Sequence, residues 1–380
     1  MLRRRLHENY FMSRTKNLLN PLNVGPLTLA NRVLMAPMTR SRSAQPGDVP
    51  TALNAQYYGQ RASAGLLISE GMPISPGAKG YAYTPGIYTE AQQLGWKKVV
   101  DEVHDNGGLI AAQLWHVGRI SHHSVLPQGQ LPLAPSAIRA KAKTFAFDSQ
   151  GSPAMVDCDT PLALSDDGIA AVVQEFVQAA LWAREAGFDL VELQGANGFL
   201  LEQFLSVTTN QRTDRYGGSL ENRARFVLEV VDAVAAAVGA ERVGVRLSPW
   251  CPPSVNDMDF SIEAQEITLY LAEALSARGI AYLHLSEWPG VQYPSGFRAQ
   301  LRELFNGAIF VCGGYQQTSA QDILVQGLAD AVAFGKPFIA NPDLPQRFVC
   351  NAELAQPDGN TFYGGDARGY TDYPALASLS

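Results

Sequence analysis

The chain has 380 residues, of which 46% are hydrophobic and 17% charged, and its 29 lysines and arginines against 36 aspartates and glutamates give a net charge of -7. The apolar residues are numerous and evenly spread, which excludes a chain that is disordered throughout. The acidic balance argues against non-specific nucleic-acid binding, and no stretch approaches the roughly 18 apolar residues of a membrane span. We therefore expect neither a nucleic acid nor a membrane as a partner.

The N-terminus and the cysteines indicate the compartment. Residues 1–16, which begin MLRRRLHENYF, are expected to form a disordered extension, because no apolar stretch of a secretory signal follows the arginines. The four cysteines are Cys158, Cys251, Cys312 and Cys350. They form no CxxC pair and predict free thiols in a reducing compartment. We expect a cytoplasmic protein.

Eight short apolar runs follow along the chain, each bounded by polar residues, Gly or Pro. They are Arg32–Pro37, Gly65–Glu70, Leu109–Leu114, Leu190–Leu193, Val243–Leu247, Ala281–Leu285, Ile309–Cys312 and Ala331–Phe334. Runs of this kind are typical of parallel strands that are buried on both faces.

Helical patterns lie between several of these runs. Apolar side chains recur at helical spacing from Ser165 to Gly187, from Leu220 to Gly239 and, more weakly, from Thr89 to Gly107. Ser165 is a suitable N-cap and Gly187 a suitable C-terminal stop. Eight strands alternating with helices predict a closed (β/α)8 barrel. A doubly wound open sheet is the alternative, although no GxGxxG motif follows any run.

One connection departs from this alternation. Residues 116–164 separate the third run from the helix that follows it, and they are too long for a plain strand-to-helix connection. We expect an elaborated loop or hairpin that caps one mouth of the barrel.

In such a barrel the functional side chains follow the C-terminal ends of the strands. Glycine-rich turns with Gly313, Gly314, Gly335 and Lys336 follow the seventh and eighth runs, where barrels often bind phosphate; the glycines would also serve simply to turn the chain. Arg246 near the end of the fifth run suits an anionic ligand, a flavin carbonyl or a rim ion pair. The six histidines lack metal-ligand spacing and no GxSxG is present, so we expect neither a metal site nor a hydrolase of that type.

Longer motifs, spread from about Asn20 to Pro374, are more specific than any single residue. They include NPLNVGPLTLANRVLMAPMTRSRS at 20–43, ISEG at 68–71, QLWHVGRISH at 113–122, TNQRTDRYGGSLENRARF at 209–226, AFGKPFIANPDLPQR at 333–347 and YGGDARGYTDYP at 363–374. Together and in this order they resemble the Old Yellow Enzyme family of FMN-dependent ene-reductases, in particular its bacterial N-ethylmaleimide reductase-like branch. The resemblance implies one FMN-binding (β/α)8 barrel domain over residues 17–375.

The resemblance also implies how FMN is held, non-covalently, at the C-terminal mouth. It places Thr39 beside the flavin O4, Gln113 at the pyrimidine edge and Arg246 near N1 and O2. Backbone contacts and the phosphate site are implied for Pro37, Met38, Gly314, Gly335 and Lys336, with Gly313 in the same turn. The family more often has Arg where Lys336 stands, so the charge is kept but the bidentate fork is lost.

The resemblance implies that the substrate face is lined by Tyr81, Trp115, Phe199 and Tyr363. It also implies that Gln194 and Asn197 hold the substrate oxygen. Gln194 stands where the family usually has His, and its amide still offers N–H donors. Phe199 stands where the family usually has the Tyr that donates a proton. Because Phe cannot donate one, we assign no general acid.

The implied activity is ping-pong transfer of hydride from NAD(P)H, through the flavin N5, to an electron-poor alkene such as an enone or a nitroalkene. Because of Phe199, a redox-neutral alkene isomerase or a dehydrogenase in a biosynthetic pathway is the alternative. A non-catalytic flavoprotein is the third, which the retention of Thr39, Gln113, Arg246 and Asn197 disfavours. Monomer and homo-oligomer remain open at this stage.

Overall fold

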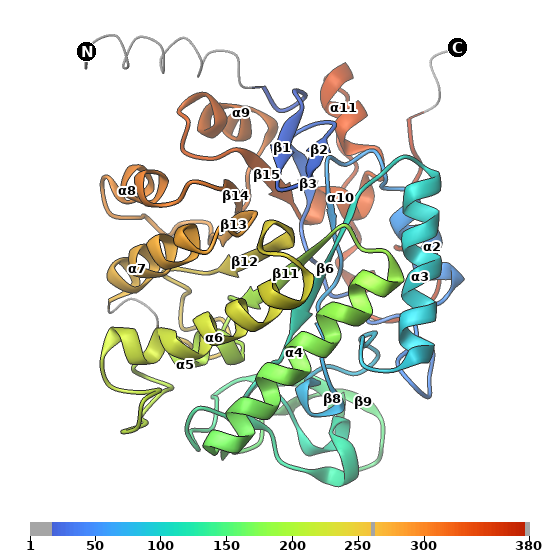
Figure 1. Ribbon diagram of the computed structural model, residues 1–380. Helices are drawn as coiled ribbons and strands as arrows, with labels where there is room; N and C mark the ends of the chain where they lie inside the picture. The colour runs from blue at the N-terminus through green and yellow to red at the C-terminus, as the bar shows by residue number, and fades with distance from the viewer. Residues whose placement is uncertain (1–16, 260–262, 377–380) are drawn as a thin grey trace, which may run out of the picture.

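The architecture is a closed barrel of parallel strands, described over residues 17–259 and 263–376 of the computed structural model (Figure 1). Its strands are β3 (Val33–Met35), β4 (Leu67–Ile68), β6 (Ile110–Trp115), β11 (Leu190–Gly195), β12 (Val243–Leu247), β13 (Tyr282–Ser286), β14 (Ala308–Cys312) and β15 (Ala331–Phe334). Each overlaps one of the eight apolar runs. β15 pairs with β3 and β6 pairs with β11, so the sheet closes on itself. The predicted (β/α)8 barrel is confirmed, and an open doubly wound sheet is excluded. The extension expected at residues 1–16 lies outside the described residues.

Helices surround the barrel (Figure 1). They are α2 (Ala52–Gly59), α3 (Glu90–Asp105), α4 (Asp166–Ala186), α5 (Leu200–Leu205), α6 (Leu220–Val238), α7 (Ala264–Ala277), α8 (Phe297–Leu304), α9 (Gln317–Val325), α10 (Lys336–Ala340) and α11 (Leu344–Cys350). Of the helices in the described part of the chain, none is long and apolar enough to cross a membrane.

The helix predicted most clearly from the sequence, α4, begins and ends as expected. The Ser165 side chain accepts a hydrogen bond from the backbone N of Gly168, and Gly187 adopts a left-handed conformation, with φ of 100°, at the C-cap. α6 ends at Val238, and the expected Gly239 is its C-cap. The weakest of the three patterns gives α3, which Thr89 caps and which ends at Asp105, two residues before the expected Gly107.

The two ends of the barrel are closed by two different hairpins. At the N-terminal end lies the hairpin of β1 (Leu22–Val24) and β2 (Leu27–Leu29), whose Val24 and Leu29 pack with buried residues of the barrel interior. At the opposite end in Figure 1 lies the antiparallel hairpin of β8 (Lys143–Phe147) and β9 (Pro153–Asp157). This second hairpin is the capping element predicted within residues 116–164.

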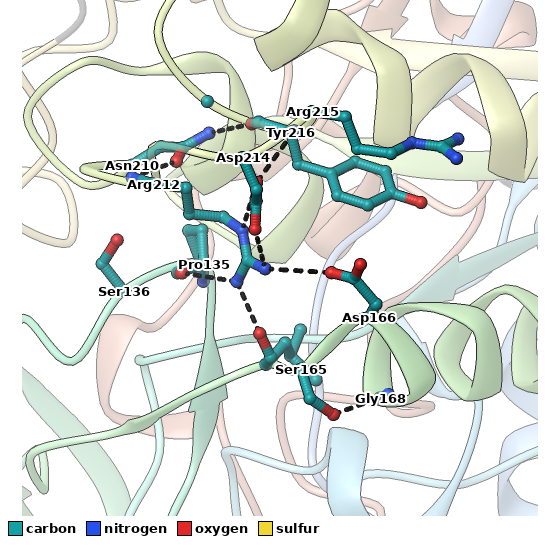
Figure 2. A network of polar contacts seen from close by, with 12 residues as sticks. Pro135, Ser136, Ser165, Asp166, Gly168, Asn210, Arg212, Asp214, Arg215 and Tyr216 are labelled. Atoms are coloured by element: carbon teal, nitrogen blue, oxygen red, sulfur yellow. Dashed lines mark hydrogen bonds and ion pairs between the residues drawn. The ribbon is translucent and has the colours of Figure 1, made fainter.

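The base of the capping segment is fixed by one arginine (Figure 2). The guanidinium of Arg212, in the loop between α5 and α6, donates to the backbone oxygen of Pro135 at 3.1 Å and to that of Leu164. It also forms ion pairs with Asp214 and with Asp166, in the first turn of α4. Arg212 therefore connects the capping segment, the start of α4 and the loop that follows α5.

Candidate active site

Two adjoining cavities lie at the C-terminal mouth. The first has a volume of ≈ 550 Å³ and is lined by Pro37, Thr39, Ser41, Tyr81, Gln113, Trp115, Phe145, Met155, Gln194, Asn197, Phe199, Arg246, Trp288 and Tyr363. The second, of ≈ 530 Å³, is lined by Pro37, Met38, Thr39, Arg40, Gly335, Lys336, Ile339, Phe362 and Tyr363. Pro37, Thr39 and Tyr363 line both. The structure thus brings almost all the expected site residues to two adjoining cavities at one mouth of the barrel.

Gly313 and Gly314 lie outside the residues that line these cavities. A Cβ on Gly313 would stand 2.6 Å from the Cβ of Glu287, and Gly314 has a φ of 73°, which few other residues adopt. Close packing and a left-handed turn account for both glycines. Their part in phosphate binding stays a prediction.

The floor of the first cavity is a buried polar network on the barrel strands. The Nε2 of Gln113, on β6, donates to Glu192 on β11 at 2.7 Å, and the Nδ1 of His284, on β13, lies 2.8 Å from the other carboxylate oxygen. Glu192 and His284 are both fully buried. The carboxylate therefore fixes the Gln113 amide, so that its Oε1 and second N–H are available to a ligand.

The charge state of this network follows from its surroundings. Burial alone would raise the pKa of Glu192, but His284 and the nearby Arg246 outweigh it, so that this pKa lies below its usual range. Burial lowers the pKa of His284. With Glu192 ionised, the Nδ1–H of His284 is the donor of their hydrogen bond, whichever charge the ring carries. The carboxylate of Glu192 lies near the guanidinium of Arg246 and stabilises its charge at the cavity floor.

Thr39 belongs to a segment that one buried carboxyl fixes. The Oε2 of Glu70 accepts hydrogen bonds from the backbone N of Arg40 and of Ser41, at 3.1 and 3.2 Å. Arg40 in turn donates to the backbone oxygens of Phe362 and Gly369, both at 2.9 Å. These bonds dock the C-terminal loop on the barrel mouth, which places Tyr363 at both cavities although its side chain is 64% exposed.

The two amides opposite the floor differ in their partners. The Oδ1 of Asn197 accepts from the Oγ of Ser286 at 3.1 Å, which leaves its Nδ2 to donate into the cavity. The Oε1 of Gln194 is buried and, among the described residues, has no hydrogen-bond partner. Because an amide oxygen accepts hydrogen bonds, a ligand that donates one would satisfy it, while the Gln194 N–H groups stay available as donors.

Aromatic side chains form the wall above these amides. The ring centroids of Trp115 and Phe199 are 5.1 Å apart, and that of Tyr81 lies 5.7 Å from Trp115 and 6.3 Å from Phe199. Phe145 and Met155, from the capping hairpin, complete the apolar lining. Burial raises the pKa of Tyr81, so its hydroxyl keeps its proton at neutral pH. The wall suits a flat, mainly apolar ligand.

The donor set fits FMN. At the end near the floor, the Nε of Arg246 is a buried donor that no residue in the described ranges accepts from, and the Gln113 amide offers one acceptor and one donor. Such groups match the carbonyl oxygens and the N–H of a flavin pyrimidine ring. At the other end, Lys336 adds a positive charge beside Gly335, where a Cβ would meet only Met38 at 3.5 Å or more. A ring site and an anion site joined through Pro37 and Thr39 have the layout that FMN requires.

Sequence reasoning assigned no role to four residues that hold the site from behind, namely Glu70, Glu192, Ser286 and His284. Glu192 and His284 did carry a signal, since each is a polar residue inside an otherwise apolar run, VELQG and AYLHLS. A charged side chain in a buried strand needs a partner, and the barrel supplies it from the neighbouring strands.

Comparison with known proteins gives one consistent result. The model of the NADH:flavin oxidoreductase / NADH oxidase family matches residues 17–354. The chain is 45% identical over 372 residues to 12-oxophytodienoate reductase 1 of Oryza sativa subsp. japonica, covering 95% of this chain and 94% of that protein.

Two solved structures are similar in the same way. The structure of morphinone reductase in complex with tetrahydroNAD has a TM-score of 0.92 and 53% identity, over 96% of this chain and 99% of that one. The Old Yellow Enzyme homologue from Zymomonas mobilis has a TM-score of 0.89 and 39% identity, over 95% and 100%. The chain therefore belongs to the NADH:flavin oxidoreductase / NADH oxidase family, the Old Yellow Enzyme family, and is an oxidoreductase that uses FMN with NAD(P)H as its reductant.

Proposed function

We propose that this enzyme reduces an electron-poor alkene, an enone or a nitroalkene, in ping-pong order. The observation that carries this proposal is the Asn197 amide, which Ser286 turns so that its N–H donors face a cavity walled by Trp115 and Phe199. An N–H donor beside an apolar wall suits a substrate with one polar oxygen on a mainly apolar body. The names of two relatives, morphinone reductase and 12-oxophytodienoate reductase, both refer to a compound with a ketone group.

The residues divide the work between the two ends of the site. Bound FMN supplies hydride transfer, first as acceptor from NAD(P)H and then as donor to the alkene. In our proposal Thr39, Gln113 and Arg246 bind the ring system, while Pro37, Met38, Gly335 and Lys336, with Gly313 and Gly314 nearby, bind the rest of the cofactor. One cavity serves both reductant and alkene, so one must leave before the other enters.

Asn197 and Gln194 act on the substrate oxygen. As hydride reaches the β-carbon, negative charge develops on that oxygen, and amide N–H donors already in place stabilise it. Trp115, Tyr81 and Phe199 exclude water from the reacting face and hold the substrate flat, and Tyr363 stands at the entrance.

Protonation of the α-carbon is the step to which we assign no residue. Phe199 is 5% exposed and has no hydroxyl, so the wall presents no acid at that position. This observation favours a second candidate function: where the proton arrives slowly, the substrate returns the hydride, and the net reaction is alkene isomerisation. A dehydrogenase in a biosynthetic pathway would use the same return step.

We further propose that residues 17–375 act as one FMN-binding domain, and that the protein works in the cytoplasm. The four cysteines support the second point, since all of them are free thiols in the structure.

Product analysis tests the proposal. The purified holoprotein is mixed anaerobically with NADH or NADPH, and the reduced enzyme is then mixed with 2-cyclohexenone or a nitroalkene. We expect reoxidation at a rate that rises with alkene concentration, and a saturated product. Recovery of a rearranged alkene without net NAD(P)H consumption would establish the isomerase instead. A reduced enzyme that only oxygen reoxidises would refute both.

A further inference from the structure

The turn between β11 and α5 presents both substrate-facing residues, Asn197 and Phe199. Asn197 has a φ of 60° and Gly198 a φ of 78°, so two consecutive residues are left-handed. Asn adopts this conformation at a cost that its surroundings must offset. Contacts around the turn therefore decide where the Asn197 amide points.

One buried carboxyl holds both backbone N–H groups of this turn. The Oε2 of Glu202, on α5, accepts from the backbone N of Gly198 at 2.5 Å. Its Oε1 accepts from the Oγ of Ser248 at 2.5 Å, and that Oγ accepts from the backbone N of Asn197 at 2.7 Å. Glu202 is 1% and Ser248 1% exposed, so water does not replace these bonds.

The remaining contacts of Asn197 leave only its amide nitrogen to the ligand. Its backbone oxygen accepts from the Nδ2 of Asn256 at 2.7 Å, and its Oδ1 accepts from the Oγ of Ser286. Glu202 thus completes a set of bonds that fixes every other polar group of this residue.

We propose that Glu202 is a positioning residue: in its ionised form, acting directly on Gly198 and through Ser248 on Asn197, it aims the Asn197 amide at the substrate oxygen. This inference rests on the proposed function, and it adds a pH-dependent control that the reaction itself does not require. A carboxylate accepts both bonds, whereas a protonated carboxyl must donate through one oxygen and loses one acceptor.

The carboxyl changes its charge in the neutral range. Burial raises the pKa of Glu202 to about 7, against the lowering effects of Ser248, Gly198 and the charge of Arg246. Cys251 is a second titratable group close to Glu202; burial raises the pKa of this thiol, so it stays neutral. The turn is consequently held tightly above pH 7 and more loosely below it.

Ketone binding tests the inference without turnover. Cyclohexanone offers the carbonyl oxygen but no alkene, and its binding to the oxidised holoprotein is followed by the absorbance of the bound flavin. In the wild type we expect affinity to rise as pH goes from 6 to 8. In Glu202→Gln, which keeps the shape but cannot ionise, we expect roughly tenfold weaker binding at pH 8, the size of one well-placed hydrogen bond, and no pH dependence.

Two further variants separate positioning from general damage. Ser248→Ala removes the link to Asn197 but leaves the carboxyl, and we expect it to weaken ketone binding with unchanged FMN content. Glu175→Gln, at a partly buried carboxyl on α4 whose pKa burial also raises, is the matched control and should match the wild type.

Each result is decisive. Wild-type affinity and pH dependence in Glu202→Gln, or in Ser248→Ala should the first variant not fold, overturn the inference while the proposed function stands. A wild-type enzyme that binds ketone with this pH profile but reduces no alkene overturns the proposed function alone.

Discussion

The floor and the wall of the cavity are built by opposite means. The floor consists of side chains on β6, β11, β12 and β13 that are 0–5% exposed and bonded to one another, as Gln113, Glu192 and His284 are. The wall includes side chains from loops and from the capping hairpin, where Met155 is 57% and Tyr363 64% exposed. A site on strands holds a fixed ligand accurately, whereas loop residues tolerate exchange. The cofactor end is therefore the rigidly held part of this enzyme and the substrate end its adaptable part.

Removing the carboxylate at the centre of the floor network should have the largest effect, a loss of stability. Glu192→Leu leaves the Nδ1–H of His284 and the Nε2–H of Gln113 without their acceptor inside the barrel. Removal of one partner from a buried ionic network typically costs about 3–5 kcal/mol of the free energy of unfolding. Urea unfolding of the apoprotein measures this loss, with Glu192→Gln, which keeps one acceptor, as the milder control. Equal stability of all three proteins would show that the network supports nothing.

A pH series tests the buried carboxyls of the mouth. Burial raises the pKa of Glu70 from its ordinary value of 4.5 to about 7. Between these values the folded chain binds more protons than the unfolded one, so the free energy of unfolding should fall as pH rises, by up to ~1.4 kcal/mol per pH unit for this group. Glu192, whose pKa is lowered, acts in the opposite sense and only at lower pH. Urea unfolding from pH 5 to 8 should show a shallower decline in Glu70→Gln; an identical decline would contradict the assignment.

Substitution at the second cavity, where Lys336 provides a positive charge, should have a smaller effect than substitution in the floor network. Lys336 is exposed, so the solvent screens part of its charge. We expect Lys336→Ala to weaken FMN binding to the apoprotein about tenfold, and Lys336→Arg to retain it. Titration of the apoprotein with FMN, followed by flavin fluorescence, gives both dissociation constants. Unchanged affinity in Lys336→Ala would place the phosphate elsewhere, with Gly313 and Gly314 as the next candidates.

The same contrast explains what the sequence could reveal. Apolar runs define strands by local pattern, and a barrel directs the residues after them to one mouth. Thr39, Gln113, Asn197 and Arg246 can therefore be placed together from the sequence alone. The bonds that support them cannot. Ser248 and Glu202 are 46 positions apart, and no local pattern reports their contact. The capping hairpin was predicted only as a hairpin or loop, because its short, half-exposed strands carry little alternation.

The smallest structural change, the addition of one hydroxyl group, concerns the aromatic wall of the cavity. In a reductase the α-carbon needs a proton during or just after hydride transfer, and a positioned acid typically contributes about 10²–10⁴-fold. Phe199 packs edge-on against Trp115, at 5.1 Å and 68° between the rings, so a tyrosine there would keep the ring and add a hydroxyl facing the substrate space. We expect Phe199→Tyr to raise net reduction of weakly activated enones, whose anions must be trapped before the hydride returns. Nitroalkenes give stabilised anions and should change little.

Rapid-mixing measurement of flavin reoxidation, paired with product analysis, separates this effect from simple packing. Tyr81 and Tyr363 are the two tyrosines that line the same cavity, so Tyr81→Phe and Tyr363→Phe are the matched controls. If enone reduction is unchanged in Phe199→Tyr but lost in either control, the proton comes from that tyrosine and the wall already contains its acid. If both controls retain activity and Phe199→Tyr gains it, the wild-type proton comes from water. The lifetime of the anion, set at the adaptable end of the site, then decides between reduction and isomerisation.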